Sequence, residues 1–447
     1  MTGVQGYVYE STSHFQVLQR NPETNIASIL IDGEIVEYKV GGPYTIGKAH
    51  NVYVGDIWIM AGQSNMRGHG FLMDPFTKNN LMHESLVDSI HLFNSSEQWT
   101  LAKDPTHRLV SSPRQVHHTL PDPTVRDPKI LEYRGASLGL AFAKKYQQLN
   151  HHVPVGLVAS AHGGTTLEDW KRPLNLFSSR KNNDDDPFNT TLYGAMIARI
   201  EQVGPITGIL WYQGESDTVK EQDAVTYKER FLQWLQDLRQ DLKRDNLPVA
   251  FVQIGSHRVD DPEMIKNWKI VQDGQRKLFD YHHFTAGVAS FDGSLDDRLH
   301  LSATALNKVG ERLAIAATCA KQGLGKTATP LPVRAVFESS SIPTLKETGI
   351  PSSIRVEFEH VNDHQGWMNK LDEEIYGFEI ECADKEVVLL SVRINDDKQW
   401  SLRLYLTSKP KAPIYISYGM NQEVKGNLIR SDGMAVPAFQ KFEVFFS

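Results

Sequence analysis

Residues 57–66 read Ile-Trp-Ile-Met-Ala-Gly-Gln-Ser-Asn-Met, an apolar run that stops at a glycine followed by polar residues. Continuous apolar runs of this length suit strands that are buried on both faces, as in a parallel sheet. Further runs follow along the chain at 153–159, 206–211, 249–254 and 286–289. Residues 57–61 therefore predict the first strand of a parallel sheet, with polar residues at its carboxyl end.

Helical patterns separate these runs. In the segment 224–242, apolar residues recur at helical spacing, at Phe231, Leu235, Leu238 and Leu242. The segment 302–320 has the same pattern at Leu306, Val309 and Leu313, and Ser302 is placed to cap its start. Alternating strands and helices over residues 51–325 predict an α/β domain with three layers and a doubly wound parallel sheet.

The two ends of the chain have different patterns. Residues 1–50 are predicted to form a small β segment, with a hairpin turn at Asp32-Gly33. A Pro-, Ser- and Thr-rich connector covers 326–352, and beyond it apolar and polar residues alternate, as in 354–359 and 402–407. This alternation predicts an antiparallel β domain over 335–447, resembling a sandwich, with one solvated face.

Composition excludes several classes of protein. The 447 residues carry 47 Lys and Arg against 54 Asp and Glu, and this net charge of -7 argues against nucleic acid as the main partner. Two cysteines, Cys319 and Cys382, are too few for a disulfide framework, although one bridge stays open. Without an apolar run long enough to span a membrane or a secretory signal, we expect a cytoplasmic protein with no membrane partner.

Polar motifs follow the first two predicted strands. Ser64 lies in the turn after the first strand, where its hydroxyl and its backbone N–H can both be exposed. After the second strand, Gly163 and Gly164 allow a backbone N–H to point into a cleft. Each motif taken alone is also explained by an ordinary turn between a strand and a helix.

Two further motifs complete the set. Gln213, after the third strand, carries an amide donor, while Glu215 is either a structural acid or a catalytic one, and the structural role is favoured. Asp297 precedes His300 by three residues, just before the last helix, so it can hold the imidazole through Nδ1 while the other nitrogen faces a nucleophile. An ordinary loop histidine with a capping aspartate is the alternative.

Taken in order, the motifs resemble those of the SGNH (GDSL-like) hydrolases. Gly62-Gln63-Ser64-Asn65-Met66, Gly163-Gly164-Thr165 and Trp211-Tyr212-Gln213-Gly214-Glu215 resemble the sialate O-acetylesterase and carbohydrate esterase branch in particular. The resemblance implies that Ser64 is the nucleophile, His300 the general base and Asp297 its orienting acid. It also implies an oxyanion hole built from the N–H of Ser64, the N–H of Gly163 or Gly164, and the amide of Gln213.

The expected activity is therefore hydrolysis of O-acetyl esters on a carbohydrate, either sialic acid or a xylan-type sugar, by a serine esterase that needs no metal or organic cofactor. Trp170 and Tyr212 could stack on a sugar ring, but core packing explains them equally well. Arg67 and Arg134 could meet a substrate carboxylate. The alternatives are a general short-chain or lipid esterase, and a noncatalytic carbohydrate-binding protein. Neither the sugar nor the oligomeric state follows from the sequence.

Overall fold

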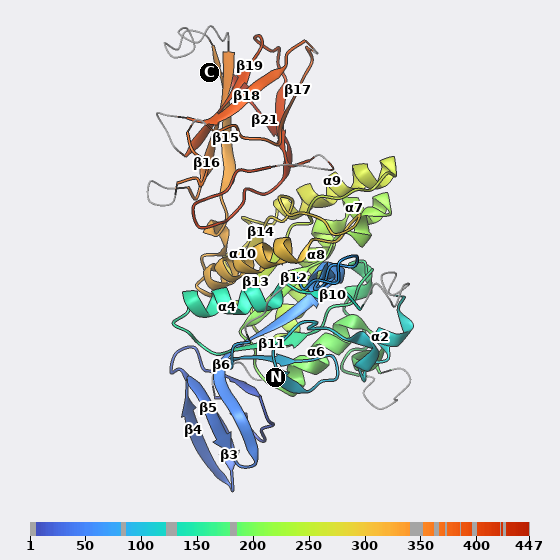
Figure 1. Cartoon of the computed structure of the whole chain (residues 1–447), viewed down its shortest axis with the longest axis vertical. Helices are drawn as coiled ribbons and strands as arrows, with labels where there is room; N and C mark the ends of the chain where they lie inside the picture. The colour runs from blue at the N-terminus through green and yellow to red at the C-terminus, as the bar shows by residue number, and fades with distance from the viewer. Residues whose placement is uncertain are drawn as a thin grey trace.

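The computed structural model describes most of the chain. The described residues are 6–81, 86–121, 132–178, 186–339, 352–361, 366–371, 373–384, 386–395, 400–420, 422 and 426–446. Along the longest axis of the molecule lie a small β unit near the N-terminus, a central α/β region and a β-rich C-terminal region (Figure 1).

The central sheet has the strand order β14-β13-β12-β6-β11-β8-β9. Every neighbouring pair is parallel except β8 and β9. The strands are β6 (Ala49–Gly62), β8 (Ile90–Phe93), β9 (Trp99–Leu101), β11 (Val155–Ala159), β12 (Gly208–Tyr212), β13 (Val249–Val252) and β14 (Thr285–Val288). All five predicted runs are strands of this sheet, which confirms a parallel-dominated α/β region, whereas β8 and β9 were not anticipated.

Helices lie on both faces of the sheet. The longer ones are α4 (Gly139–Leu149), α6 (Leu192–Val203), α8 (Tyr227–Leu242), α9 (Pro262–Arg276) and α10 (Ala303–Lys321). The short ones are α1 (Ser64–Arg67), α2 (Val116–Thr119), α5 (Pro187–Thr190) and α7 (Glu221–Val225). The two predicted helices are confirmed as α8 and α10, and the Ser302 side chain caps α10 by accepting the N–H of Ala305 at 3.2 Å.

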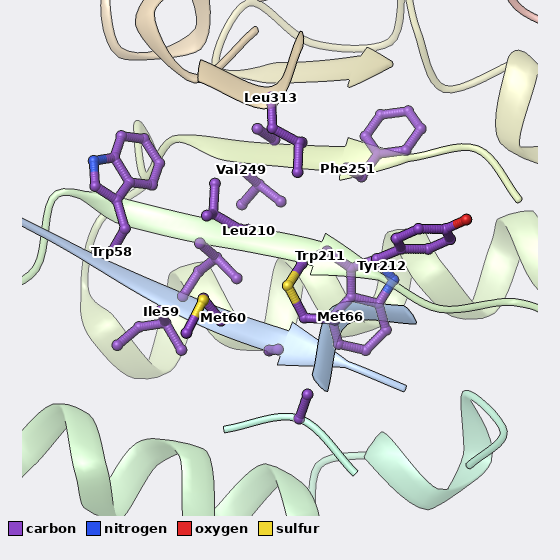
Figure 2. Packing of buried hydrophobic residues seen from close by; sticks show 14 of the residues in the cluster. Trp58, Ile59, Met60, Met66, Leu210, Trp211, Tyr212, Val249, Phe251 and Leu313 are labelled. Carbon is purple, nitrogen blue, oxygen red and sulfur yellow. The ribbon is translucent and has the colours of Figure 1, made fainter. Parts of the chain in front are cut away.

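Alternation along the strands sends large side chains to opposite faces of the sheet. Trp58 on β6 packs edge-to-face against Phe142 of α4, with ring centroids 5.6 Å apart. Trp211 on β12 instead packs against Trp234 of α8 at 4.3 Å. Figure 2 shows Trp58 and Trp211 among the apolar side chains that pack around β6, β12 and β13. Burial on both faces explains why the strands are apolar throughout.

The N-terminal unit is a three-stranded sheet in the order β1-β3-β4 (Val8–Tyr9, Ile26–Ile31 and Glu34–Lys39). The β3-β4 pair is antiparallel and turns at Asp32-Gly33, where both residues have positive φ, so the predicted hairpin is confirmed. Two more strands, β2 (Val17–Gln19) and β5 (Gly41–Ile46), pair with the first half of β6.

The C-terminal region has a five-stranded sheet, β18-β19-β16-β15-β22, and a three-stranded sheet, β17-β20-β21. Their bounds are Leu331–Ser339 (β15), Ser352–Glu359 (β16), Phe378–Cys382 (β17), Leu389–Ile394 (β18), Ser401–Leu406 (β19), Ile414–Tyr418 (β20), Phe439–Glu443 (β21) and Phe445–Phe446 (β22). All pairs are antiparallel except β15 with β22, and the described residues of this region contain no helix, as predicted.

The C-terminal core includes two residues from the α/β region, Ala289 and Phe291. Phe291, which follows β14, is buried in the cluster formed by the two C-terminal sheets. Gln253, which follows β13, exchanges two hydrogen bonds with the backbone of Ala438, at 2.8 and 2.9 Å. Arg312 of α10 donates to the Gly433 carbonyl at 2.8 Å. The two regions are therefore joined by apolar packing and by satisfied polar contacts.

Two smaller expectations were also tested. Cys319 and Cys382 are both free thiols. No helix in the described ranges combines the length and apolar character that crossing a bilayer requires.

Candidate active site

Three loops meet at the carboxyl edge of the central sheet, because β6, β11 and β12 run parallel and adjacent. Gly62 lies beside Tyr212 in the register of β6 and β12. The N–H of Gln63 donates to the Tyr212 carbonyl at 2.8 Å, and that of His162 donates to the Gly62 carbonyl at 2.9 Å. The motifs after the three strands are thus hydrogen-bonded neighbours, as expected for an open α/β sheet.

Glycine at position 62 is required by this arrangement. Its φ is +132°, and a Cβ at this position would lie 2.1 Å from the Tyr212 carbonyl oxygen. The chain can therefore turn sharply from β6 into α1, which makes Ser64 the first residue of that short helix.

Ser64 and His300 are in direct contact. Nε2 of His300 lies 2.9 Å from the Ser64 hydroxyl oxygen. Nδ1 of the same ring lies 2.8 Å from Oδ2 of Asp297. The structure thus brings together all three residues predicted for the triad, from two loops far apart in the sequence.

Asp297 is a strongly held carboxylate. Its Oδ1 accepts the backbone N–H groups of Leu299 and His300, both at 2.9 Å. Partial burial acts to raise the pKa of Asp297, but the hydrogen bonds from His300 and from the two backbone groups outweigh burial and hold it well below the usual range. Asp297 is therefore ionised at neutral pH and can stabilise a protonated His300.

Asn65 fixes the backbone on both sides of His300. Its Oδ1 accepts the N–H of Leu301 at 3.1 Å, and its Nδ2 donates to the Leu299 carbonyl at 3.3 Å and to Oε1 of Glu215 at 2.6 Å. Asn65 is 1% exposed. It was quoted only as part of the serine motif, so its role in holding the histidine loop is a finding of the structure.

Glu215 lies behind this amide and is completely buried. Burial raises its pKa to about 7, although the Asn65 hydrogen bond acts in the opposite direction. Its second oxygen, Oε2, has no hydrogen-bond partner among the described residues. Glu215 contacts the triad only through Asn65, which agrees with the favoured structural role.

His69 is a second residue that the sequence analysis missed. Its ring lies 4.0 Å from that of His300, centroid to centroid, and its Nδ1 is 3.1 Å from Nη2 of Arg67. Burial, followed by the charges of His300, Arg134 and Arg67, lowers the pKa of His69 to about 2. His69 is therefore a neutral ring packed against the base.

Two residue types common in metal sites are present here, but the local charge opposes a cation. Ligand-type atoms of His69, Asp297 and His300 lie within 4.8 Å of one another. The guanidinium of Arg134, however, lies 2.9 Å from Asp297, so positive charge already faces this carboxylate. We therefore interpret the group as a hydrogen-bonded catalytic set.

The glycine loop lies beside the serine. Gly163 is buried and Gly164 is exposed, with φ +73° at Gly164. Within the described part of the chain, the backbone N–H groups of Ser64, Gly163 and Gly164 have no hydrogen-bond partner. Free N–H groups next to a nucleophile are what an oxyanion hole requires.

Gln213 is placed differently from the expectation. Its Nε2 donates to the buried carboxylate of Asp217 and, at 3.0 Å, to the carbonyl of Thr165. Because these two bonds use both hydrogens of the amide, and because the side chain is 0% exposed, Gln213 has no hydrogen left for an oxyanion. In this structure it braces the loops after β11 and β12 against each other.

Two of the four speculative substrate contacts, those of Trp170 and Tyr212, are also corrected. Trp170 and Tyr212 are both 0% exposed; the Trp170 ring packs 5.2 Å from that of Trp211, and the Tyr212 hydroxyl bonds Ser290 at 3.1 Å. Both are core residues, because no ring face is left for a sugar. Arg67 and Arg134 are buried as well and contact His69 and Asp297.

Comparison with known proteins agrees with these features. Residues 54–319 match the family model described as "Carbohydrate esterase, sialic acid-specific acetylesterase". A probable carbohydrate esterase of Arabidopsis thaliana is 27% identical over 213 residues, which are 45% of this chain and 69% of that protein. The human sialate O-acetylesterase is 25% identical over 260 residues, covering 49% of this chain and only 45% of the relative.

A solved structure extends the likeness to nearly the whole chain. The crystal structure of a carbohydrate acetylesterase from Xanthomonas citri aligns with a TM-score of 0.65 and 22% identity, covering 96% of this chain and 98% of that one. At this identity the alignment demonstrates a shared fold, including the regions that flank the α/β sheet.

Proposed function

The chain belongs to the carbohydrate esterase family of sialic acid-specific acetylesterases, which makes it a carboxylic ester hydrolase, and we propose that it removes O-acetyl groups from a carbohydrate with Ser64 as nucleophile. The observation that carries this proposal is the unbroken chain of contacts from the Ser64 hydroxyl through His300 to Asp297. The layered SGNH architecture is part of the proposal, and the parallel sheet with helices on both faces supports it.

Each residue then has a defined step. Nε2 of His300 takes the proton of the Ser64 hydroxyl as its oxygen attacks the acetyl carbonyl carbon. The N–H of Ser64 and the N–H of Gly163 or Gly164 stabilise the oxyanion that forms. His300 next gives the proton to the departing sugar oxygen, which leaves an acetylated serine, and a water molecule activated by the same ring releases acetate.

The substrate class follows from the relatives. Sialate O-acetylesterases and carbohydrate acetylesterases are among the proteins that this chain resembles, so acetylated sialic acids and acetylated xylo-oligosaccharides are the substrates to test first. A noncatalytic binding protein would have no need of an aligned serine, histidine and aspartate.

The test is release of p-nitrophenol from p-nitrophenyl acetate by wild type and by Ser64→Ala, followed by acetate release from the two sugar panels. We expect Ser64→Ala to lose activity on the order of 10³-fold or more while staying folded. Ser178→Ala, at an exposed serine remote from the triad in sequence, is the matched control and should keep full activity. Activity of Ser64→Ala above about a tenth of wild type would refute the assignment.

A further inference from the structure

Arg134 is clamped against the acid of the triad. It lies on β10 (Arg134–Ala136), which pairs with β7 (Gly70–Phe71). Its Nη2 is 2.9 Å from Oδ2 of Asp297, and its Nη1 donates to the His69 carbonyl at 2.8 Å. The guanidinium also stacks 4.1 Å above the ring of Phe71. Three contacts therefore fix its position.

Arg134 contacts one of the two Asp297 oxygens that face His300, since Nδ1 of the ring lies 2.9 Å from Oδ1 and 2.8 Å from Oδ2. Oδ2 of Asp297 lies 2.8 Å from Nδ1 of the imidazole and 2.9 Å from the guanidinium. The Arg134 side chain is 7% exposed, whereas that of Asp297 is 31% exposed. A buried guanidinium thus covers the side of the carboxylate that carries Oδ2, while the backbone N–H groups of Leu299 and His300 hold Oδ1.

The charges around the pair are few. Asp296 precedes Asp297 on the same loop and accepts the N–H of Phe71 at 2.7 Å. The His69 ring packs against His300 and contacts Arg67, and His69 is neutral because burial keeps its pKa low. Arg134 is consequently the cation in direct contact with the triad carboxylate.

We propose that Arg134 is a positioning residue of the triad, which holds the Asp297 carboxylate against His300 and offsets part of its negative charge. The proposal rests on the proposed serine mechanism. It replaces the sequence-based idea that Arg134 binds a substrate carboxylate. Offsetting the charge of Asp297 weakens the attraction of that carboxylate for positive charge on the adjacent ring, so removal of Arg134 should change the pH dependence of the rate.

The experiment compares Arg134→Gln, Arg134→Lys and the control Arg239→Gln. Arg239 is also a buried arginine, but it bonds Leu247 and Thr285 at the amino ends of β13 and β14, away from the triad. For each variant, kcat and KM for p-nitrophenyl acetate are measured from pH 5 to pH 9. This substrate is neutral, so loss of a substrate-carboxylate contact would not affect it.

We expect Arg134→Gln to lower kcat by about ten- to a hundredfold, the effect of losing a hydrogen bond to a charged group, with KM nearly unchanged. The acidic limb of its rate profile should move to higher pH by on the order of one unit. Arg134→Lys keeps the positive charge but not the planar guanidinium group. It should therefore restore the wild-type position of the acidic limb and part of the wild-type kcat. Arg239→Gln should leave the limb unmoved.

Three results would overturn the proposal. The acidic limb of Arg134→Gln could stay at its wild-type pH, or the limb of Arg134→Lys could move as far as that of Arg134→Gln. The third result is a wild-type kcat in either variant. If Arg134→Gln does not fold, the test rests on Arg134→Lys alone. A reduced kcat with the acidic limb of the pH–rate profile at its wild-type position then supports the proposal. Any other profile overturns it. Failure of the serine mechanism is recognised separately, by activity in Ser64→Ala.

Discussion

Replacing Glu215 with glutamine should remove a pH-dependent instability from the protein. Burial raises the pKa of Glu215 from 4.5 to about 7. Between these two values the unfolded chain has released this proton while the folded protein still binds it. The stabilising contribution of protonated Glu215 is therefore fully present below about pH 4.5, and it is lost as the pH rises through about 7.

The magnitude follows from the size of the shift. At 1.36 kcal/mol per pKa unit, a shift of this size corresponds to about 3 kcal/mol of unfolding free energy. Glu215 is completely buried, so solvent screening does not reduce this value greatly. Glutamine keeps the oxygen that accepts the Asn65 amide at 2.6 Å but carries no ionisable proton.

The assay is urea unfolding of wild type and Glu215→Gln at half-unit steps from pH 5 to pH 8. The difference in unfolding free energy between the two should change by about 2.5 kcal/mol across this range, with glutamine gaining relative to glutamate as the pH rises. Glu311→Gln, at an exposed position on α10, should show no such change. A constant difference between wild type and Glu215→Gln would refute the reasoning, since it would mean that Glu215 ionises as readily in the folded protein as in the unfolded chain.

Four other predictions concern the reaction. Asp297→Asn should lower kcat by roughly 10³- to 10⁴-fold without unfolding the protein, as judged by circular dichroism, and full activity would show that another group orients His300. Asn65→Ala leaves the Leu301 N–H and one Glu215 oxygen without partners, so urea unfolding should reveal a loss of about 2–5 kcal/mol together with a reduced kcat; an unaffected kcat would contradict the role given to Asn65. EDTA should leave the rate unchanged, whereas inhibition reversed by added metal would point to a bound cation. Along the series p-nitrophenyl acetate, butyrate and octanoate, kcat/KM should fall; a rise would instead reflect an apolar groove that gains about 0.8 kcal/mol per methylene and would favour a lipid esterase.

Much of the fold was predictable because burial on both faces leaves a clear sequence pattern. The run at 57–61 became the end of β6, and the predicted helices became α8 and α10. The edge strands β8 and β9 were not predicted, because they are short and because β8 contains a polar residue, His91. Nδ1 of His91 bonds the carbonyl of Phe15, which belongs to another part of the chain. Such tertiary partners are not visible in a local pattern.

The residues of the site also differ in how far the sequence predicts them. Ser64, Asp297 and His300 were predicted from the order of the motifs, which resembles that of the SGNH hydrolases, because each motif taken alone also fits an ordinary turn. Gln213 had the right position but not the right surroundings, because the nearby buried carboxylate of Asp217 takes its amide. His69 gave no signal at all, since its contact with His300 exists only after β7 and β10 have paired.

The burial of Phe291 among the C-terminal strands has a consequence for how the chain can be divided. Phe291 anchors the start of the loop that carries the acid and the base, and Leu301 anchors its end in the core of the α/β region. A gene fragment that stops before residue 331 would remove the strands that bury Phe291, although the ion pair between Arg312 and Asp292 would still hold the start of this loop. Any chimera or shortened version of the chain must therefore supply a new apolar cover for Phe291.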